Sequence, residues 1–191
     1  INLTKSGFAN YDPRWGIDGT MTYFGSTREG AADMAGDTVT LDICGIFLTR
    51  EAYDRFRLSK VDFDLLKEQE DKAKEEKEKA EKEKAKDSKA KETEVKKEEP
   101  KKDIVIELEG IENRKARFTI NSADIADMAL TKTGDKLCYL AGFEKGYDLW
   151  MTELRTKDTK LFAKLGARRA SMELSSDGKA LFVLAEGKIT K

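Results

Sequence analysis

A glycine turn that runs directly into a β-rich segment occurs three times in this chain, and this repeat constrains the fold more than any single residue. The three copies are IDGTMTYFGSTREG at 17–30, KTGDKLCYLAGFEKG at 132–146 and SSDGKALFVLAEGK at 175–188. The turn glycine of each copy can adopt the positive φ that a tight reversal requires. These glycines are Gly19, Gly134 and Gly178. Each copy therefore predicts a turn that leads into a β-strand.

The spacing of the turns predicts the blades of a β-propeller. Gly134 and Gly178 are 44 residues apart, which is within the range of a blade repeat. Gly19 and Gly134 are 115 residues apart, so the first blade must contain a large insertion. Because propellers typically use about four to eight blades, two or three cannot close a ring. We expect an all-β fold of antiparallel blades, an incomplete propeller, in a chain that is a fragment of a longer protein.

The chain divides by composition into two stretches of blade strands and a charged insertion between them. We expect blade strands in residues 1–50, a helical Lys/Glu-rich insertion in 51–102, and blade strands that continue past the chain end in 103–191. Between 67 and 102, 27 of 36 residues are charged and Val95 is the only sizeable apolar side chain. A capping-box pattern at Ser59 predicts a helix from Lys60, and Pro100 ends it. Acid and lysine pairs four residues apart support a solvated helix.

Outside the insertion, alternation and β-branched residues predict the individual strands. The segment 1–24 is expected to form inner strands of a blade. Its aromatic side chains are expected to supply the bulk: Phe8, Tyr11, Trp15, Tyr23 and Phe24. Further strands are expected at 37–48, 103–109, 116–120, 136–141, 147–154 and 160–165. Thr49 is expected to cap a short helix that precedes the charged insertion.

Composition excludes several classes of function. The 36 Lys and Arg residues nearly cancel 37 Asp and Glu residues, so nothing favours nucleic acid or an anionic membrane as a partner. The sequence contains no run of about 18 apolar residues, the length that a transmembrane helix needs, so we expect no membrane insertion. Histidine is absent, which rules out a Ser-His or Cys-His pair and the common zinc sites. We therefore expect no catalytic residue, no cofactor and no metal ligand, and leave substrate-binding residues unassigned.

Four features admit both a functional and a structural interpretation. Cys44 and Cys138 lie among apolar residues, where buried free thiols are favoured over a disulfide. The aromatic strand 147–150 could bind a ligand, but inter-blade core is favoured. Four basic residues could contact an acidic ligand, but a solvated loop is favoured: Arg155, Lys157, Arg168 and Arg169. The charged insertion is interpreted as a helical or disordered excursion because its charges interleave.

Several ordered motifs resemble one protein family across nearly all of the chain. These are EGIENR at 109–114, RFTIN at 117–121, FEKGYDLW at 143–150 and IFLTREAY at 46–53, together with the Lys/Glu-rich insertion. In this combination they resemble the N-terminal β-propeller region of tricorn-type serine peptidases, particularly bacterial, Bacteroides-like members. The resemblance implies a multidomain endopeptidase with propellers, a PDZ-like domain and a catalytic domain that carries serine, histidine and glutamate.

None of those catalytic residues matches a position in this sequence, so the resemblance assigns no catalytic residue here. The resemblance implies a noncatalytic propeller segment that gates or binds peptides or unfolded polypeptide for a catalytic domain elsewhere. It also implies that a homo-oligomer is possible, and it leaves a periplasmic or cytoplasmic location open with the periplasm slightly favoured. The alternative is a stand-alone propeller like the Tol-system component, which acts as a protein-interaction module. A catalytic domain encoded after Lys191 would discriminate between the two.

Overall fold

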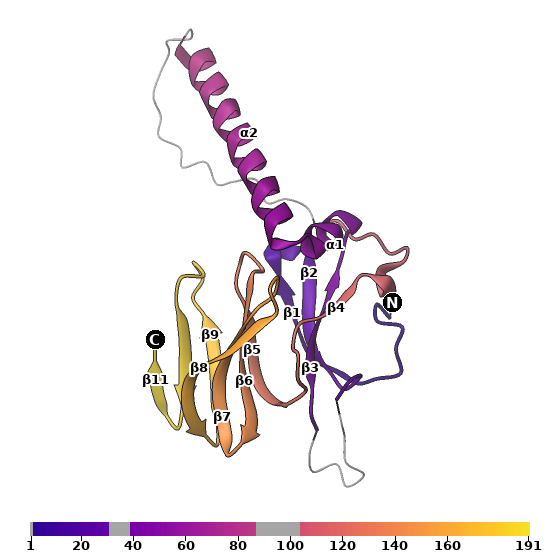
Figure 1. Cartoon of the computed structure of the whole chain (residues 1–191), viewed down its shortest axis with the longest axis vertical. Coiled ribbons are helices and arrows are strands. Elements are labelled where there is room, and N and C mark those ends of the chain that lie inside the picture. The colour runs from indigo at the N-terminus through magenta and orange to yellow at the C-terminus, as the bar shows by residue number, and fades with distance from the viewer. Residues whose placement is uncertain (1, 31–38, 87–103) are drawn as a thin grey trace. The chain divides into compact units, whose positions relative to one another are not determined.

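The computed structural model describes residues 2–30, 39–86 and 104–191, which belong to two compact units (Figure 1). One unit comprises Ile1–Phe56 and Ile104–Lys191 and contains every described strand; we call it the β body. The other comprises Arg57–Asp103 and contains helix α2 (Lys60–Lys86). The shorter helix α1 (Arg50–Arg57) precedes it along the chain. No helix within these ranges is both long enough and apolar enough to cross a membrane.

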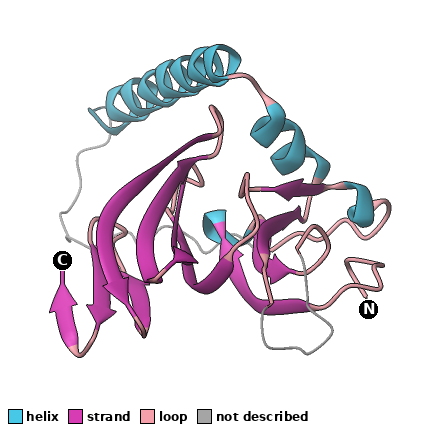
Figure 2. Ribbon diagram, turned by 60° about the horizontal axis from the view of Figure 1, so that its bottom comes forward, coloured by secondary structure: helices cyan, strands magenta, loops and turns pink. Residues whose placement is uncertain are grey.

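The β body consists of three sheets in which every strand pairing is antiparallel (Figure 2). Sheet 1 has the order β1 (Asn10–Gly16), β2 (Met21–Ser26), β3 (Asp42–Phe47), β4 (Lys115–Arg117). Sheet 2 has the order β5 (Asp124–Leu130), β6 (Lys136–Glu144), β7 (Gly146–Glu153), β8 (Asp158–Ala167). Sheet 3 contains β9 (Ala170–Leu174), β10 (Leu181–Ala185) and β11 (Lys188–Thr190). The predicted antiparallel, mostly-β fold is confirmed, and these sheets form no closed ring.

The three repeated turns occupy equivalent places, because each joins the first strand of a sheet to the second. The amide of Gly134 donates to the carbonyl of Thr131 at 2.8 Å, and the amide of Gly178 donates to that of Ser175 at 2.8 Å. In sheet 1 the short 3-10 helix Ile17–Gly19 takes this place. All three turn glycines have the positive φ that the sequence predicted.

Strand register matches across the three sheets as well. In each sheet the residue four positions before the turn glycine pairs with the same position of the second strand. These pairs are Trp15 with Thr22, Leu130 with Leu137 and Leu174 with Leu181. The turn glycines therefore align the first two strands of every sheet residue by residue, so side chains at equivalent positions can be compared directly.

The larger of two apolar clusters is built from all three sheets. Its members include Met21, Ile43, Phe118, Leu137, Leu140, Met172 and Val183. Leu137, Tyr139 and Leu140 are extended and almost fully buried, as the strand prediction requires. Both faces of β6 are covered at these positions, since alternate side chains of a strand point to opposite faces.

The predicted aromatic core of the first segment is only partly correct. Tyr23 and Phe24 on β2 are buried, but Phe8, Tyr11 and Trp15 are exposed by 49%, 47% and 60%. The latter two lie on β1, which pairs with β2 alone and forms the edge of sheet 1. An edge position leaves bulky side chains open to solvent that a central strand would cover.

The strand predicted at 103–109 is wrong for the residues that are described. Ile104–Leu108 makes no strand pairing; the Glu107 amide donates to the Leu48 carbonyl at 2.9 Å, and the Leu108 carbonyl accepts the Ile111 amide at 3.4 Å. The side of β3 that this segment could have joined is taken by β4. Two further predicted strands differ from the structure in extent. The strand predicted at 37–48 corresponds to β3, which begins at Asp42, and residues 37 and 38 lie outside the described residues. The strand predicted at 116–120 corresponds to β4, which ends at Arg117.

Both predicted helix caps are present. The Ala52 amide donates to Thr49 Oγ1 at 3.2 Å at the start of α1, and the Asp62 amide donates to Ser59 Oγ at 3.2 Å at the start of α2. Helix α2 begins at Lys60 as predicted, and it is described as far as Lys86. The predicted end of the helix at Pro100 lies outside the described residues.

Arg114 connects the two chain segments that leave and re-enter sheet 1, residues 47–48 and 107–109, through hydrogen bonds. Its side chain is almost fully buried and donates only to main-chain carbonyls. Nε donates to Phe47 at 3.1 Å, Nη1 to Glu109 at 2.9 Å, and Nη2 to Leu48 at 3.3 Å and to Glu107. A buried guanidinium with its donors satisfied in this way also gives each of the four carbonyls a charged donor.

Replacing Arg114 by Met should lower the free energy of unfolding of the β body by about 3 kcal/mol, because the four carbonyls lose their charged donor. Urea denaturation followed by tryptophan fluorescence measures the change. Arg168→Met is the matched control, since that arginine is exposed, and it should change stability by less than about 0.5 kcal/mol. Equal effects of the two substitutions would contradict a fastening role for Arg114.

Candidate binding site between the first strands of the sheets

The first strands β1, β5 and β9 are joined by polar contacts that centre on Asp127. Arg14 of β1 donates from Nη2 to Asp127 Oδ1 at 2.7 Å and from Nη1 to the Met128 carbonyl. The Met172 amide of β9 donates to Asp127 Oδ2 at 2.6 Å, and the Met128 amide donates to Oδ1 at 2.8 Å. One carboxylate therefore accepts bonds from all three sheets, and it uses both of its oxygens to do so.

Arg14 is held between two carboxylates. Its Nη2 also lies 2.5 Å from Asp12 Oδ2. Burial disfavours the charged form of Arg14, but Asp12 and Asp127 more than offset this, so the pKa of Arg14 lies above its ordinary value. The guanidinium is therefore engaged by protein groups and is not a free anion-binding cation.

A hollow of about 400 Å³ lies beside these contacts, at the turn ends of the three first strands. We call it the first-strand hollow. Its lining combines apolar and charged side chains: Tyr23, Leu130, Lys132, Met172 and Glu173. Leu130 and Met172 offer apolar surface to a ligand, and Lys132 and Glu173 offer one charge of each sign.

The first-strand hollow offers apolar, hydrogen-bonding and charged groups to a ligand. Its lining contains neither a cysteine nor a serine, and the chain has no histidine to act as a base. In the part of the chain that the structure describes, no three His, Cys, Asp or Glu residues are grouped as metal ligands. Burial raises the pKa of Tyr23, whose hydroxyl accepts the Leu130 amide at 3.4 Å. This tyrosine therefore stays a neutral hydrogen-bonding group at physiological pH.

Sequence reasoning missed this site. Trp15 was assigned to the core, and neither Arg14 nor Asp127 stood out in the sequence. The one available signal was the position of these residues just before the repeated turns, where the first strands of successive sheets approach one another.

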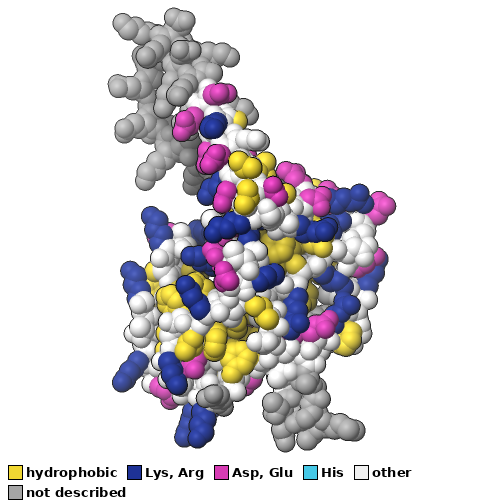
Figure 3. Space-filling model, in the orientation of Figure 1, with side chains coloured by type: hydrophobic (Ala, Val, Ile, Leu, Met, Phe, Trp, Pro, Cys, Tyr) yellow, Lys and Arg dark blue, Asp and Glu magenta, His cyan; other side chains and the backbone are white. Residues whose placement is uncertain are grey.

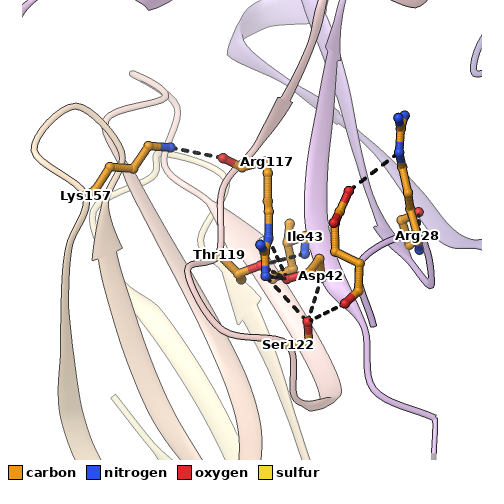
Figure 4. Close-up of polar contacts among 9 residues, drawn as sticks. Arg28, Asp42, Ile43, Arg117, Thr119, Ser122 and Lys157 are labelled. Carbon is orange, nitrogen blue, oxygen red and sulfur yellow. Dashed lines mark hydrogen bonds and ion pairs between the residues drawn. The ribbon is translucent and has the colours of Figure 1, made fainter. Parts of the chain in front are cut away.

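A second buried carboxylate, Asp42, organises the junction of β3 and β4 (Figure 4). It accepts bonds from Arg117 Nη2 at 2.7 Å, Thr119 Oγ1 at 2.8 Å and Ser122 Oγ at 2.8 Å. The carbonyl of Arg117 accepts the Lys157 ammonium at 3.0 Å. Because these protein donors already occupy both oxygens of Asp42, we interpret the cluster as structural.

One of the four basic residues, Arg155, is largely withdrawn from solvent, so the solvated-loop interpretation is wrong for it. Arg155 donates from Nη1 to the Arg55 and Phe56 carbonyls at 3.3 and 3.4 Å, at the end of α1. Lys157 is exposed in the turn between β7 and β8, as expected, although partial desolvation lowers its pKa. Arg168 and Arg169 are exposed, as expected.

The aromatic strand 147–150 contributes mainly to packing. Leu149 is in the core, and Trp150 packs against the core and edge-on to Phe143 with ring centroids 5.0 Å apart. In Figure 3 apolar side chains also reach the surface over β6 to β8. Exposed members of these strands are Phe143, Leu161 and Phe162.

The two cysteines are free thiols, as predicted. Burial raises the pKa of Cys44 to about 11 and raises that of Cys138 in the same direction. Both thiols are therefore protonated and weakly nucleophilic near neutral pH.

Asp127→Ala should lower the free energy of unfolding by about 2–4 kcal/mol, because it leaves the Met172 amide and one side of Arg14 without an acceptor. Asp124→Ala on the same strand removes only an exposed bond from Tyr147 and serves as the control. Chemical denaturation of both variants measures the difference. Comparable stability of the two variants would show that the Asp127 contacts do not hold the sheets together.

Comparison with known proteins gives a fold relationship. No family model matches the chain, and no curated protein matches it. The solved structure titled "Crystal structure of the tricorn protease" matches with a TM-score of 0.56 and 13% sequence identity. The match covers 98% of this chain and 16% of that chain, so this chain spans only a small part of the protease's length. The described β body therefore has a tricorn-related fold.

Proposed function

We propose that this chain is a noncatalytic β-propeller segment of a tricorn-like serine protease, and that it binds peptides for a catalytic domain outside the chain. The first-strand hollow is the observation that carries this proposal. It is a concave site lined by apolar side chains and by one charge of each sign, in a fold related to that of a protease, and no Ser-His or Cys-His pair lines it. Concave sites of this mixed lining are typical of ligand binding.

The finer parts of the proposal rest on the sequence motifs. They favour the N-terminal propeller of a bacterial, Bacteroides-like member, with a homo-oligomer possible and a periplasmic location slightly preferred. The nearly balanced charge is compatible with peptide partners of varied sequence, since it attracts neither strongly acidic nor strongly basic ligands.

Peptide binding should depend on the charged lining of the first-strand hollow. The anisotropy of unstructured fluorescein-labelled peptides of about ten residues should rise on addition of the protein, and Lys132→Ala should weaken the binding of acidic peptides about threefold, because it removes a charged contact from the hollow. Lys160→Ala, which removes the same charge at an exposed position of β8 outside the hollow, is the matched control and should leave affinity unchanged. If no peptide in a diverse set binds, but a folded partner does, the interaction-module alternative is favoured.

The chain should show no peptidase activity of its own, because no histidine is present to activate a serine. Incubation with the same peptides should yield no cleavage products by mass spectrometry, and a fluorophosphonate probe should label no residue. Stoichiometric labelling of one serine would contradict the noncatalytic assignment.

A further inference from the structure

We propose that the first-strand hollow binds an extended peptide through the peptide's main chain, along the free edge of β9. This inference rests on the peptide binding proposed above and specifies how the peptide is held. Recognition through the main chain would make the site tolerant of peptide sequence.

At the edge of β5 that no described strand pairs with, side chains of the neighbouring sheet bond to the outward main-chain groups. Side chains of sheet 1 reach across to it: Arg14 donates to the Met128 carbonyl, and the Tyr23 hydroxyl accepts the Leu130 amide at 3.4 Å. Arg14 and Tyr23 pair directly across β1 and β2, so they project from the same face of sheet 1. Sheet 1 thereby supplies both a donor and an acceptor to the edge of sheet 2.

Sheet 2 cannot do the same for sheet 3. The aligned turn glycines place Ala129 and Cys138 where sheet 1 has Arg14 and Tyr23, and these two residues also pair directly. Alanine has no polar atom, and a thiol is a weak donor and acceptor on a short side chain. The two side chains that would close the β9 edge are therefore missing at the equivalent positions.

The alternation of β9 shows which main-chain groups are left on that edge. The Ser175 amide donates toward β10, to Ala180 at 2.8 Å, whereas the Met172 amide points away from β10 to Asp127. Because inward and outward groups alternate along an antiparallel strand, the Met172 carbonyl and the Leu174 amide share the outward edge. Among the residues that the structure describes, no protein group bonds to either, and both residues line the first-strand hollow.

An acceptor at Met172 and a donor at Leu174 match the main chain of an extended peptide. One residue of a β-strand presents its N–H and C=O on the same side, so a single peptide residue can pair with both groups. The hollow of about 400 Å³ provides room beside the edge.

Single N-methylation of a bound peptide tests the inference. Each variant peptide replaces one main-chain N–H by N–CH₃, and affinity is measured by competition against the labelled parent. N-methylation of every second peptide residue, whose N–H groups face the β9 edge, should weaken binding about three- to tenfold. Replacing the side chains of those residues by alanine should change affinity less than twofold. If the peptide binds, but N-methylation has no effect and side-chain truncation does, the main-chain mode is overturned while peptide binding stands. If no peptide binds, both proposals fail.

A substitution that restores the missing side chain provides a second test. Ala129→Arg places a guanidinium at the position equivalent to Arg14, where it can donate a hydrogen bond to the Met172 carbonyl and fill the hollow. Peptide affinity should fall at least about tenfold. Ala126→Arg adds the same charge at an exposed position of the same strand and should leave affinity unchanged. Equal affinity of a folded Ala129→Arg variant would overturn the proposed location, and the N-methyl series decides the matter if that variant does not fold.

Discussion

The arrangement of the three sheets depends on where the Asp127 carboxylate lies. A register shift in β5 between Ile125 and Asp127 turns this side chain toward the junction with β1 and β9. In β1 the register also shifts, between Tyr11 and Arg14, so both partners of the central ion pair follow an irregularity of their strands. Two local departures from regular pairing thus bring a cation and an anion from different sheets to one point.

Features set by local chemistry could be predicted from the sequence. The turn glycines, the start of α2 at Lys60 and the buried strand around Leu140 all follow from residues that are neighbours along the chain. Trp15, Ile104–Leu108 and Arg155 were misjudged because their environment depends on which strand edge or helix end another segment covers. Propensity describes a segment's own preference and contains no information on that competition.

The candidate site was harder to predict than the fold for a related reason. Its features are a main-chain edge and the absence of two side chains, and no sequence motif marks either. Once the pairing of β1 with β2 and of β5 with β6 is known, the contrast between Arg14 and Ala129 becomes meaningful. The sequence repeat provides the alignment, but only packing shows that these positions face the next sheet.

The contacts of Arg114 and Glu107 also determine how sheet 1 tolerates its long excursion. The Glu107 amide reaches the Leu48 carbonyl at 2.9 Å and its carboxylate accepts the Arg50 amide at 2.9 Å, so the two ends of the excursion are anchored within the β body itself. Closing a longer loop between anchored ends costs only about 0.6 kcal/mol per doubling of length. The junction can therefore serve as a graft point, where segments of very different length and composition could be exchanged, in engineering or in evolution, without rebuilding the sheet beneath.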